Sequence, residues 1–173
     1  TETTGLDSNV EALTEIGAVY VENGKINPDK SFCTFVNPGK PIPQKVVELT
    51  GINDSMVADA PTPAEAIRQF KEFCGDNILV AHNANSFDML FIRKAGDKAG
   101  VDFSNTYIDT LPMAQALFPG LHNYKLDTIN KHLEIQPFNH HRAVDDAMAL
   151  ARIYEVMLTD LEEKDIHTVE SIN

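Results

Sequence analysis

Three short stretches of the sequence carry acidic residues in settings that could do chemistry. Glu2 lies in the stretch TETTGL, Asp88 in HNANSFD and Asp146 in HHRAVDDA, and the last two stretches also contain histidine. An aspartate near the start of a helix is usually a cap for free backbone N–H groups, so each residue alone is a weak signal. Together they suit phosphodiester hydrolysis assisted by two divalent cations, which needs several acidic ligands and a base for the attacking water.

The strands expected to position these residues fall into two groups. Residues 15–22 are rich in β-forming side chains, and Asn23-Gly24 predicts a tight hairpin turn into a strand that begins at Lys25. Residues 31–36 predict another strand of the same antiparallel meander. The continuous apolar run at 78–81 is typical of a strand buried on both faces, and residues 107–109 predict one more strand.

Helices are expected between and after these strands. Thr62 and Glu65 form a capping box around Pro63, which predicts that a helix begins there. Further helices are predicted at residues 44–49, 87–99, 110 onward, 125–132 and 143–158. Antiparallel strands followed by alternating strands and helices predict an α/β fold, in which helices cover a mixed sheet. The charged residues 159–173 are expected to form a tail or a connection to a larger protein.

The composition indicates one globular domain. With 173 residues, 43% of them hydrophobic, the chain can bury a core without disulfides or a structural metal. Cys33 and Cys74 lie in unrelated segments without metal-ligand spacing, which favours reduced thiols and a cytoplasmic protein. No apolar run is long enough to cross a membrane, so no membrane partner is expected. The net charge of −12 argues against a module with a basic nucleic-acid-binding face, although carboxylates can hold cations that attract phosphate.

The order and separation of four motifs add a family resemblance. TETTGL, LTGI, HNANSFD and HHRAVDD together resemble the motifs of the DEDDh, or DnaQ-like, 3′→5′ exonucleases. Nearly end to end, the chain is similar to the proofreading exonuclease segment of PolC-type bacterial DNA polymerase III, including VNPGKPIP, ILVAHNA and IDTLPMAQALFP. The resemblance implies an RNase H-like fold, with a mixed five-stranded sheet flanked by helices, and an exonuclease domain over residues 1–158.

The resemblance also implies a catalytic site. It assigns Glu2, Asp88 and Asp146 as ligands of two Mg²⁺ or Mn²⁺ ions, and His141 as the general base that accepts a proton from water. A near-neutral imidazole suits that role.

A second histidine and a second aspartate lie beside the assigned pair. His140 with Asp145 keeps the same interval as His141 with Asp146, so spacing alone leaves both pairs open. The later pair is preferred because Asp146 falls on the expected inward side of its helix. Asp145 is then expected to be solvated or to support the ligands indirectly.

Ten residues match the family's nucleotide-binding positions. One group follows the first acidic residue, a second would form an apolar wedge beside the penultimate base, and a third would shape the nucleotide pocket. In chain order they are Thr3, Thr4, Gly5 and Leu6; Leu49, Thr50 and Ile52; and His82, Asn83 and Phe87. Simpler roles stay open: a turn after a strand for the first group, a helix end at Gly51 for the second, and core packing for Phe87.

Two features depart from the family pattern. The first motif is normally Asp-x-Glu, and its aspartate ends a central strand; because the sequence holds neither, we expect further residues before Thr1 or another segment in that strand's place. In the second motif His82 and Asp88 are six residues apart instead of five. Since Phe87 and Asp88 stay together, we expect the preceding loop to absorb the extra residue, so that deleting Ser86 preserves activity.

These inferences predict a metal-dependent 3′→5′ DNA exonuclease that proofreads for a replicative polymerase and releases nucleoside 5′-monophosphates. Its expected partners are a DNA 3′ end, single-stranded or frayed, and a polymerase with other replisome components in the same polypeptide. Two alternatives stay open. An enzyme of the same family could degrade RNA ends, and an inactive domain could be kept as a structural or binding module.

Overall fold

The fold is described by a computed structural model that covers residues 1–135 and 142–164. Both candidate bases, His140 and His141, and the end of the predicted tail lie outside the described residues. The described part contains five strands and seven helices, with antiparallel strands first and alternating strands and helices afterwards. This order confirms the predicted α/β class.

Three strands form an antiparallel sheet in the order β1 (Glu2–Thr3), β2 (Leu13–Glu22) and β3 (Lys25–Phe35). The predicted turn joins β2 to β3, and Asn23 and Gly24 have positive φ angles of 52° and 73°, which suit a tight hairpin turn. The register shifts between Val19 and Tyr20, which pair with Ser31 and Asn27. The two strands predicted on either side of residues 28–30 are therefore one irregular strand.

Two further strands, β4 (Leu79–Ala81) and β5 (Tyr107–Asp109), form a separate parallel sheet. The single five-stranded sheet that the resemblance implies is thus divided in two, since no pairing among the described strands joins β2 to β4. The prediction that β4 is buried on both faces is wrong, because all its residues are half-buried and the preceding Ile78 is 47% exposed. The physical reason is that β4 pairs only with β5 among the described strands and also lines a groove.

The predicted helices are present, and one more was not predicted. α3 begins at the predicted capping box, in which Thr62 and Glu65 exchange side-chain and backbone hydrogen bonds. The additional helix is α2, a single turn capped by the side chain of Asn53. α7 continues past its predicted end at Leu158, because Leu161 packs into the apolar cluster beneath α5 and α6. The bounds are α1 (Gln44–Thr50), α2 (Asp54–Val57), α3 (Pro63–Cys74), α4 (Asp88–Ala99), α5 (Thr110–Leu117), α6 (Leu126–His132) and α7 (Ala143–Glu163).

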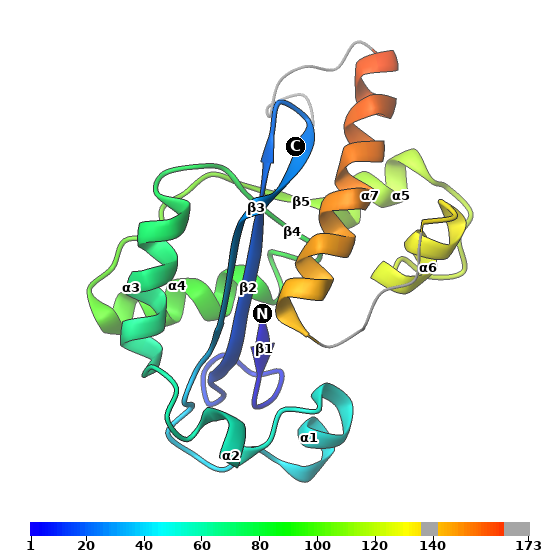
Figure 1. Cartoon of the computed structure of the whole chain (residues 1–173). Helices are drawn as coiled ribbons and strands as arrows, with labels where there is room; N and C mark the ends of the chain where they lie inside the picture. The colour runs from blue at the N-terminus through cyan, green and yellow to red at the C-terminus, as the bar shows by residue number, and fades with distance from the viewer. Residues whose placement is uncertain (136–141, 165–173) are drawn as a thin grey trace.

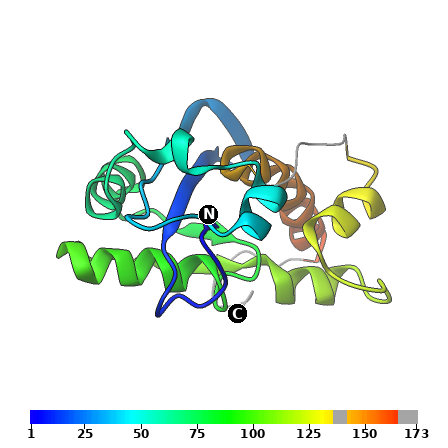
Figure 2. The same ribbon diagram turned by 90° about the horizontal axis from the view of Figure 1, so that it is seen from below.

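The β2–β3 hairpin runs through the middle of the molecule, with α3 on one side and α7 on the other (Figure 1). One apolar cluster joins the hairpin to α3 and α4, and a second joins β5, α5, α6 and α7. A smaller cluster holds α1 and α2 around Ile52. The N-terminus lies at the centre, between α1 and the line formed by α4 and α5 (Figure 2). In the described ranges, none of the helices is both long and apolar enough to span a bilayer.

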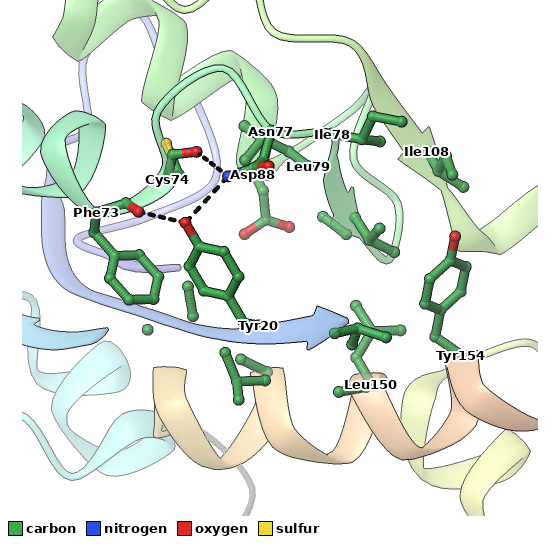
Figure 3. Close-up of a pocket in the computed structure, with 18 of the residues that line it drawn as sticks. Tyr20, Phe73, Cys74, Asn77, Ile78, Leu79, Asp88, Ile108, Leu150 and Tyr154 are labelled. Carbon is green, nitrogen blue, oxygen red and sulfur yellow. Dashed lines mark hydrogen bonds between the residues drawn. The ribbon is translucent and has the colours of Figure 1, made fainter. Parts of the chain in front are cut away.

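A groove of about 580 Å³ separates the two sheets and is lined by β2, β4, α3, α4 and α7. Thr1 and Asp88 also contribute to its lining. Figure 3 shows the largely apolar wall, in which the Tyr20 hydroxyl donates to the Phe73 carbonyl oxygen at 2.7 Å and accepts from Asn77 Nδ2 at 3.1 Å. The central strand implied by the resemblance would lie between these sheets; that strand stays a prediction.

Candidate active site

Three acidic residues reach one region of the molecule from three different elements. Glu2 lies in β1, Asp88 is the first residue of α4, and Asp146 lies in the first turn of α7. Burial is the largest cause of a raised pKa of Glu2, which is about 7, although the Thr1 ammonium group lowers it. The carboxylates of Asp146, Glu15 and Asp88 also raise this pKa. The predicted ligands are thus close enough to influence one another.

The α-amino group of Thr1 lies among these carboxylates. Its ammonium nitrogen is 2.7 Å from Asp88 Oδ1, and the Thr1 hydroxyl donates to the same oxygen at 2.8 Å. Burial lowers the pKa of this ammonium group, but the charge and hydrogen bond of Asp88, together with the charges of Glu2 and Asp146, raise the pKa overall. The region therefore favours positive charge, as expected where several carboxylates converge.

The donor chemistry of this region fits a hard divalent cation, because Mg²⁺ and Mn²⁺ prefer carboxylate oxygens. The side-chain positions fit less well. Within residues 1–135 and 142–164, no three His, Cys, Asp or Glu side chains are close enough to hold a metal ion together. Asp88 is instead bound by Thr1. The structure thus gathers the three carboxylates without arranging them as a finished metal site.

Asp145 and Asp146 act on different neighbours. Asp146 contributes to the raised pKa of Glu2. Burial is the main cause of a raised pKa of Cys33, and Asp145 is one of the smaller contributors. The choice of Asp146 over Asp145 as the ligand stays a prediction. The choice between His140 and His141 stays a prediction, because both fall outside the described residues.

The first turn of α7 is held by a residue of β2 that the sequence analysis did not single out. The buried carboxylate of Glu15 accepts hydrogen bonds from Arg142 Nη2 and from the backbone N–H of Ala143, both at 2.8 Å. Two residues further along β2, a Cβ atom on Gly17 would lie only 2.2 Å from the backbone nitrogen of Val144. The start of α7 therefore packs directly on the backbone of β2.

A second buried carboxylate, Asp109 at the end of β5, holds the loop that leads into α4. It accepts the backbone N–H groups of Asn83 and Asn85 at 2.9 and 3.1 Å, and it also caps α5 through Leu111. The loop forms turns at residues 82–87, and α4 begins at Asp88. The residues between His82 and Asp88 thus lie in turns and not in the helix, and absorption of the extra residue by this loop stays a prediction.

The loop residues assigned to nucleotide binding differ in whether their side chains are free to contact a nucleotide. Both ring nitrogens of His82 are engaged, Nδ1 with the Thr110 hydroxyl at 2.9 Å and Nε2 with the Tyr124 carbonyl oxygen at 2.6 Å. Burial lowers the pKa of His82, which favours the neutral ring. Asn83 is exposed, whereas Phe87 packs on the core beside Phe91. His82 and Phe87 therefore shape the loop from within.

Two exposed leucines stand out among the remaining assigned residues. Leu6 is 85% and Leu49 is 58% exposed, so both could meet a base. The predicted wedge is otherwise corrected: Ile52 is fully buried in the α1–α2 cluster, and the Thr50 hydroxyl donates to the Val46 carbonyl oxygen inside α1. Thr50 lies on the buried face of α1, and Ile52, in the link between the two helices, is covered by apolar residues of both.

The residues around the first motif turn inward as well. Thr3 and Thr4 are buried, and their hydroxyls donate to the Gly5 carbonyl oxygen and to the Glu11 carboxylate. A Cβ atom on Gly5 would lie 2.9 Å from Glu11 Cγ, so the space next to this glycine is already taken by Glu11. The predicted close approach of a nucleotide to Gly5 stays a prediction, and the side chains of Thr3 and Thr4 serve the local turn.

Comparisons with known proteins show the family of the chain. The exonuclease family model RNase_T matches residues 1–154. Proteins named DNA polymerase III PolC-type from Caldanaerobacter subterraneus subsp. tengcongensis and Clostridium perfringens are each 46% identical, and that from Bacillus subtilis is 42% identical. Each match covers 99% of this chain but 12% of the relative, so the chain spans about an eighth of the length of these proteins.

Two solved structures show the same fold. Exonuclease X in complex with 5′ overhanging duplex DNA has a TM-score of 0.76 and 26% identity, over 99% of this chain and 93% of that one. Escherichia coli exonuclease I in complex with a dA16 oligonucleotide has a TM-score of 0.81 and 18% identity, over 94% of this chain and 40% of that one. With its RNase H-like α/β fold and a family match over residues 1–154, this chain belongs to the exonuclease family.

Proposed function

We propose that the chain is a divalent-metal-dependent 3′→5′ DNA exonuclease that removes misincorporated nucleotides for a replicative polymerase. The observation that carries this proposal is the convergence of Glu2, Asp88 and Asp146 from β1, α4 and α7, with the pKa of Glu2 raised to about 7. Carboxylates are costly to gather unless a cation or proton compensates them. A cation-binding catalytic site explains why three separate elements bring them together.

Each residue has a proposed task in the reaction. Glu2, Asp88 and Asp146 would hold Mg²⁺ or Mn²⁺, two ions per site. When bound, such ions supply Lewis-acid activation of water and stabilise the leaving oxygen. His141 would accept the proton of the attacking water. The exposed Leu6 and Leu49 would contact the bases at the 3′ end.

The net charge of −12 bears on how DNA arrives. A chain this acidic gains little from nonspecific attraction to phosphates, so its affinity for DNA on its own should be low and sensitive to salt. The relatives named as polymerases are about eight times longer than the matched segment. We therefore propose that the 3′ end is delivered by polymerase and replisome components, in the cytoplasm. The alternatives of RNA hydrolysis and of an inactive binding module are outcomes of the test below.

The test incubates 5′-labelled single-stranded DNA and RNA of one sequence with the chain and Mg²⁺ or Mn²⁺. Stepwise shortening of DNA from the 3′ end supports the proposal, and a strong preference for RNA would overturn its substrate. Asp146→Ala should reduce shortening to a small residual rate, with Asp145→Ala as the matched control that keeps the full rate. No shortening of either oligonucleotide by the unaltered chain, or equal loss in both variants, contradicts the proposal.

A further inference from the structure

The start of α7 is fixed by a buried carboxylate that the proposed reaction does not use. The Glu15 side chain is 0% exposed although it lies on β2 among apolar neighbours. Arg142 approaches it with two nitrogens, Nη2 at 2.8 Å and Nε at 3.2 Å from Oε1, while Oε2 accepts the Ala143 N–H. The Arg142 guanidinium group also lies over the Phe35 ring, 5.2 Å from its centroid.

This arrangement caps α7 from outside the helix. The residue before the helix, Arg142, makes no side-chain capping bond of its own, so the first backbone N–H of α7 depends on Glu15. A carboxylate at this place compensates the positive end of the helix dipole and accepts charge-assisted hydrogen bonds. The close packing of Gly17 against Val144 leaves the helix no room to move toward the sheet.

The same contact reaches the acidic cluster within one helical turn. The backbone N–H of Asp146 donates to the Arg142 carbonyl oxygen at 2.9 Å, so the residue held by Glu15 directly precedes the turn that carries Asp146. On the other side, Glu15 is the cross-strand partner of Glu2. Glu15 therefore links two of the three proposed ligands through short, hydrogen-bonded connections.

A purely structural role would not require these groups. A buried ion pair is often replaced by apolar residues of similar volume without loss of stability, because desolvation offsets the Coulomb attraction. What an apolar side chain cannot do is fix the direction and rotation of a helix end through directed hydrogen bonds.

We infer that Glu15 is a positioning residue of the exonuclease site, which sets the start of α7 and thereby the place of Asp146 relative to Glu2. The inference rests on the proposed function.

The first variant is Glu15→Gln, which keeps the size of the side chain and removes its charge. The matched control is Glu155→Gln: Glu155 Oε1 accepts the Ile26 N–H at 2.6 Å, joining the same helix to the hairpin far from the acidic cluster. We expect Glu15→Gln to lower kcat by about 10- to 100-fold with KM for DNA nearly unchanged, and Glu155→Gln to leave both nearly unchanged. Equal effects of the two variants, or a change confined to KM, would overturn the inference.

Two further measurements separate positioning from folding. In the Asp146→Ala background, Glu15→Gln should change the residual rate by less than about twofold, because its effect passes through Asp146. Arg142→Lys keeps the charge at a half-exposed site and removes the two-nitrogen contact, so it should fold and give a smaller loss of kcat. The inference is contradicted if the losses of rate from Glu15→Gln and Asp146→Ala add up in the double variant. A fully active Arg142→Lys protein also contradicts it.

The failure of this inference is distinguishable from the failure of the proposed function. If the unaltered chain does not shorten DNA, the proposed function fails and the inference falls with it. If the chain shortens DNA and Glu15→Gln remains as active as Glu155→Gln, only the positioning role is rejected. Calorimetric titration with Mn²⁺ adds a readout besides activity, since Glu15→Gln should weaken Mn²⁺ binding about 10-fold or more.

Discussion

The starts of α4 and α7 each bring one aspartate to Glu2, but the protein holds them in different ways. Asp88 follows a loop of turns, and the buried anchor Asp109 binds backbone N–H groups of that loop. Asp146 lies inside a helix whose first N–H is itself bound by the anchor Glu15. Each anchor is a buried carboxylate on a strand, and neither belongs to the acidic cluster assigned from the motifs.

This difference indicates where the structure can tolerate change. The loop before α4 has exposed residues, and residues 82–87 lie in turns before the helix begins at Asp88. The start of α7 is packed against the sheet, because its backbone at Ala143 and Val144 lies close to the backbone of β2 at Gly17. We therefore expect the protein to tolerate changes in the loop before α4. We expect it to tolerate very few changes where the start of α7 packs on β2.

The largest effect is expected from Gly17→Ala. The new methyl group would lie 2.2 Å from the Val144 nitrogen, so either α7 or β2 must shift. We expect a loss of about 3 kcal/mol in the free energy of unfolding, measured by urea denaturation. Gly5→Ala is the control, because its methyl group meets the side chain of Glu11 rather than backbone, and it should lose less than about 1 kcal/mol. Equal losses would show that the α7 contact is not tight.

Asp109→Ala should have the next largest effect on stability. It removes the acceptor of three backbone N–H groups, those of Asn83, Asn85 and Leu111. We expect a loss of about 2 kcal/mol in thermal or urea denaturation. The exposed Asp102 also accepts a backbone N–H, from Ser104 at 2.9 Å, and Asp102→Ala should cost about 0.5 kcal/mol or less. A stable Asp109→Ala protein would contradict its role as the loop anchor.

The burial of Glu2 near the starts of the two helices predicts that the stability of the fold depends on pH. Burial first, and then the neighbouring carboxylates, raise the pKa of Glu2 from 4.5 to about 7, so the folded state binds the proton more tightly than the unfolded state. This contribution to stability is complete below pH 4.5 and is lost as pH rises to about 7. Without divalent cations, stability should fall by about 1 to 2 kcal/mol across this range, a figure reduced for partial exposure. Glu2→Gln should remove this fall in the free energy of unfolding with pH. An unchanged fall would contradict the claim that Glu2 is buried among the other carboxylates.

The smallest effect is expected from deleting Ser86. This exposed residue lies in the turns before α4, and Asn83 and Asn85 remain to bind Asp109. The deletion should keep the fold and the rate of DNA shortening within about threefold of the unaltered chain. Complete loss of activity in a folded deletion variant would show that the loop cannot absorb a change of length.

Local signals were sufficient for much of the fold. Thr62, Pro63 and Glu65 determine where α3 begins, and Asn23-Gly24 determines the hairpin turn, because each depends on the backbone of a few adjacent residues. The division into two sheets could not be predicted from local signals, since it depends on which strand edges meet in space. The single-turn helix α2 was missed because its capping residue Asn53 also suits an ordinary turn.

The candidate site shows the same limit. The motifs selected Glu2, Asp88 and Asp146; the charges of Asp88 and Asp146 raise the pKa of Glu2, and the role of the three as ligands stays a prediction. The anchors were missed because a carboxylate on a strand is normally taken as solvent-facing. A signal existed for both: Glu15 interrupts an apolar strand beside Gly17, and Asp109 stands directly before a helix, where a cap is expected.

The most direct test of the central claim is a calorimetric titration of the chain with Mn²⁺. The account predicts binding by the unaltered chain, loss of binding in Asp88→Asn and Asp146→Asn, and unchanged binding in the matched control Asp145→Asn. That result would show that residues from α4 and α7 contribute to one cation site. No binding, or binding that survives both ligand variants, would contradict the claim that these carboxylates are the metal ligands of this exonuclease domain.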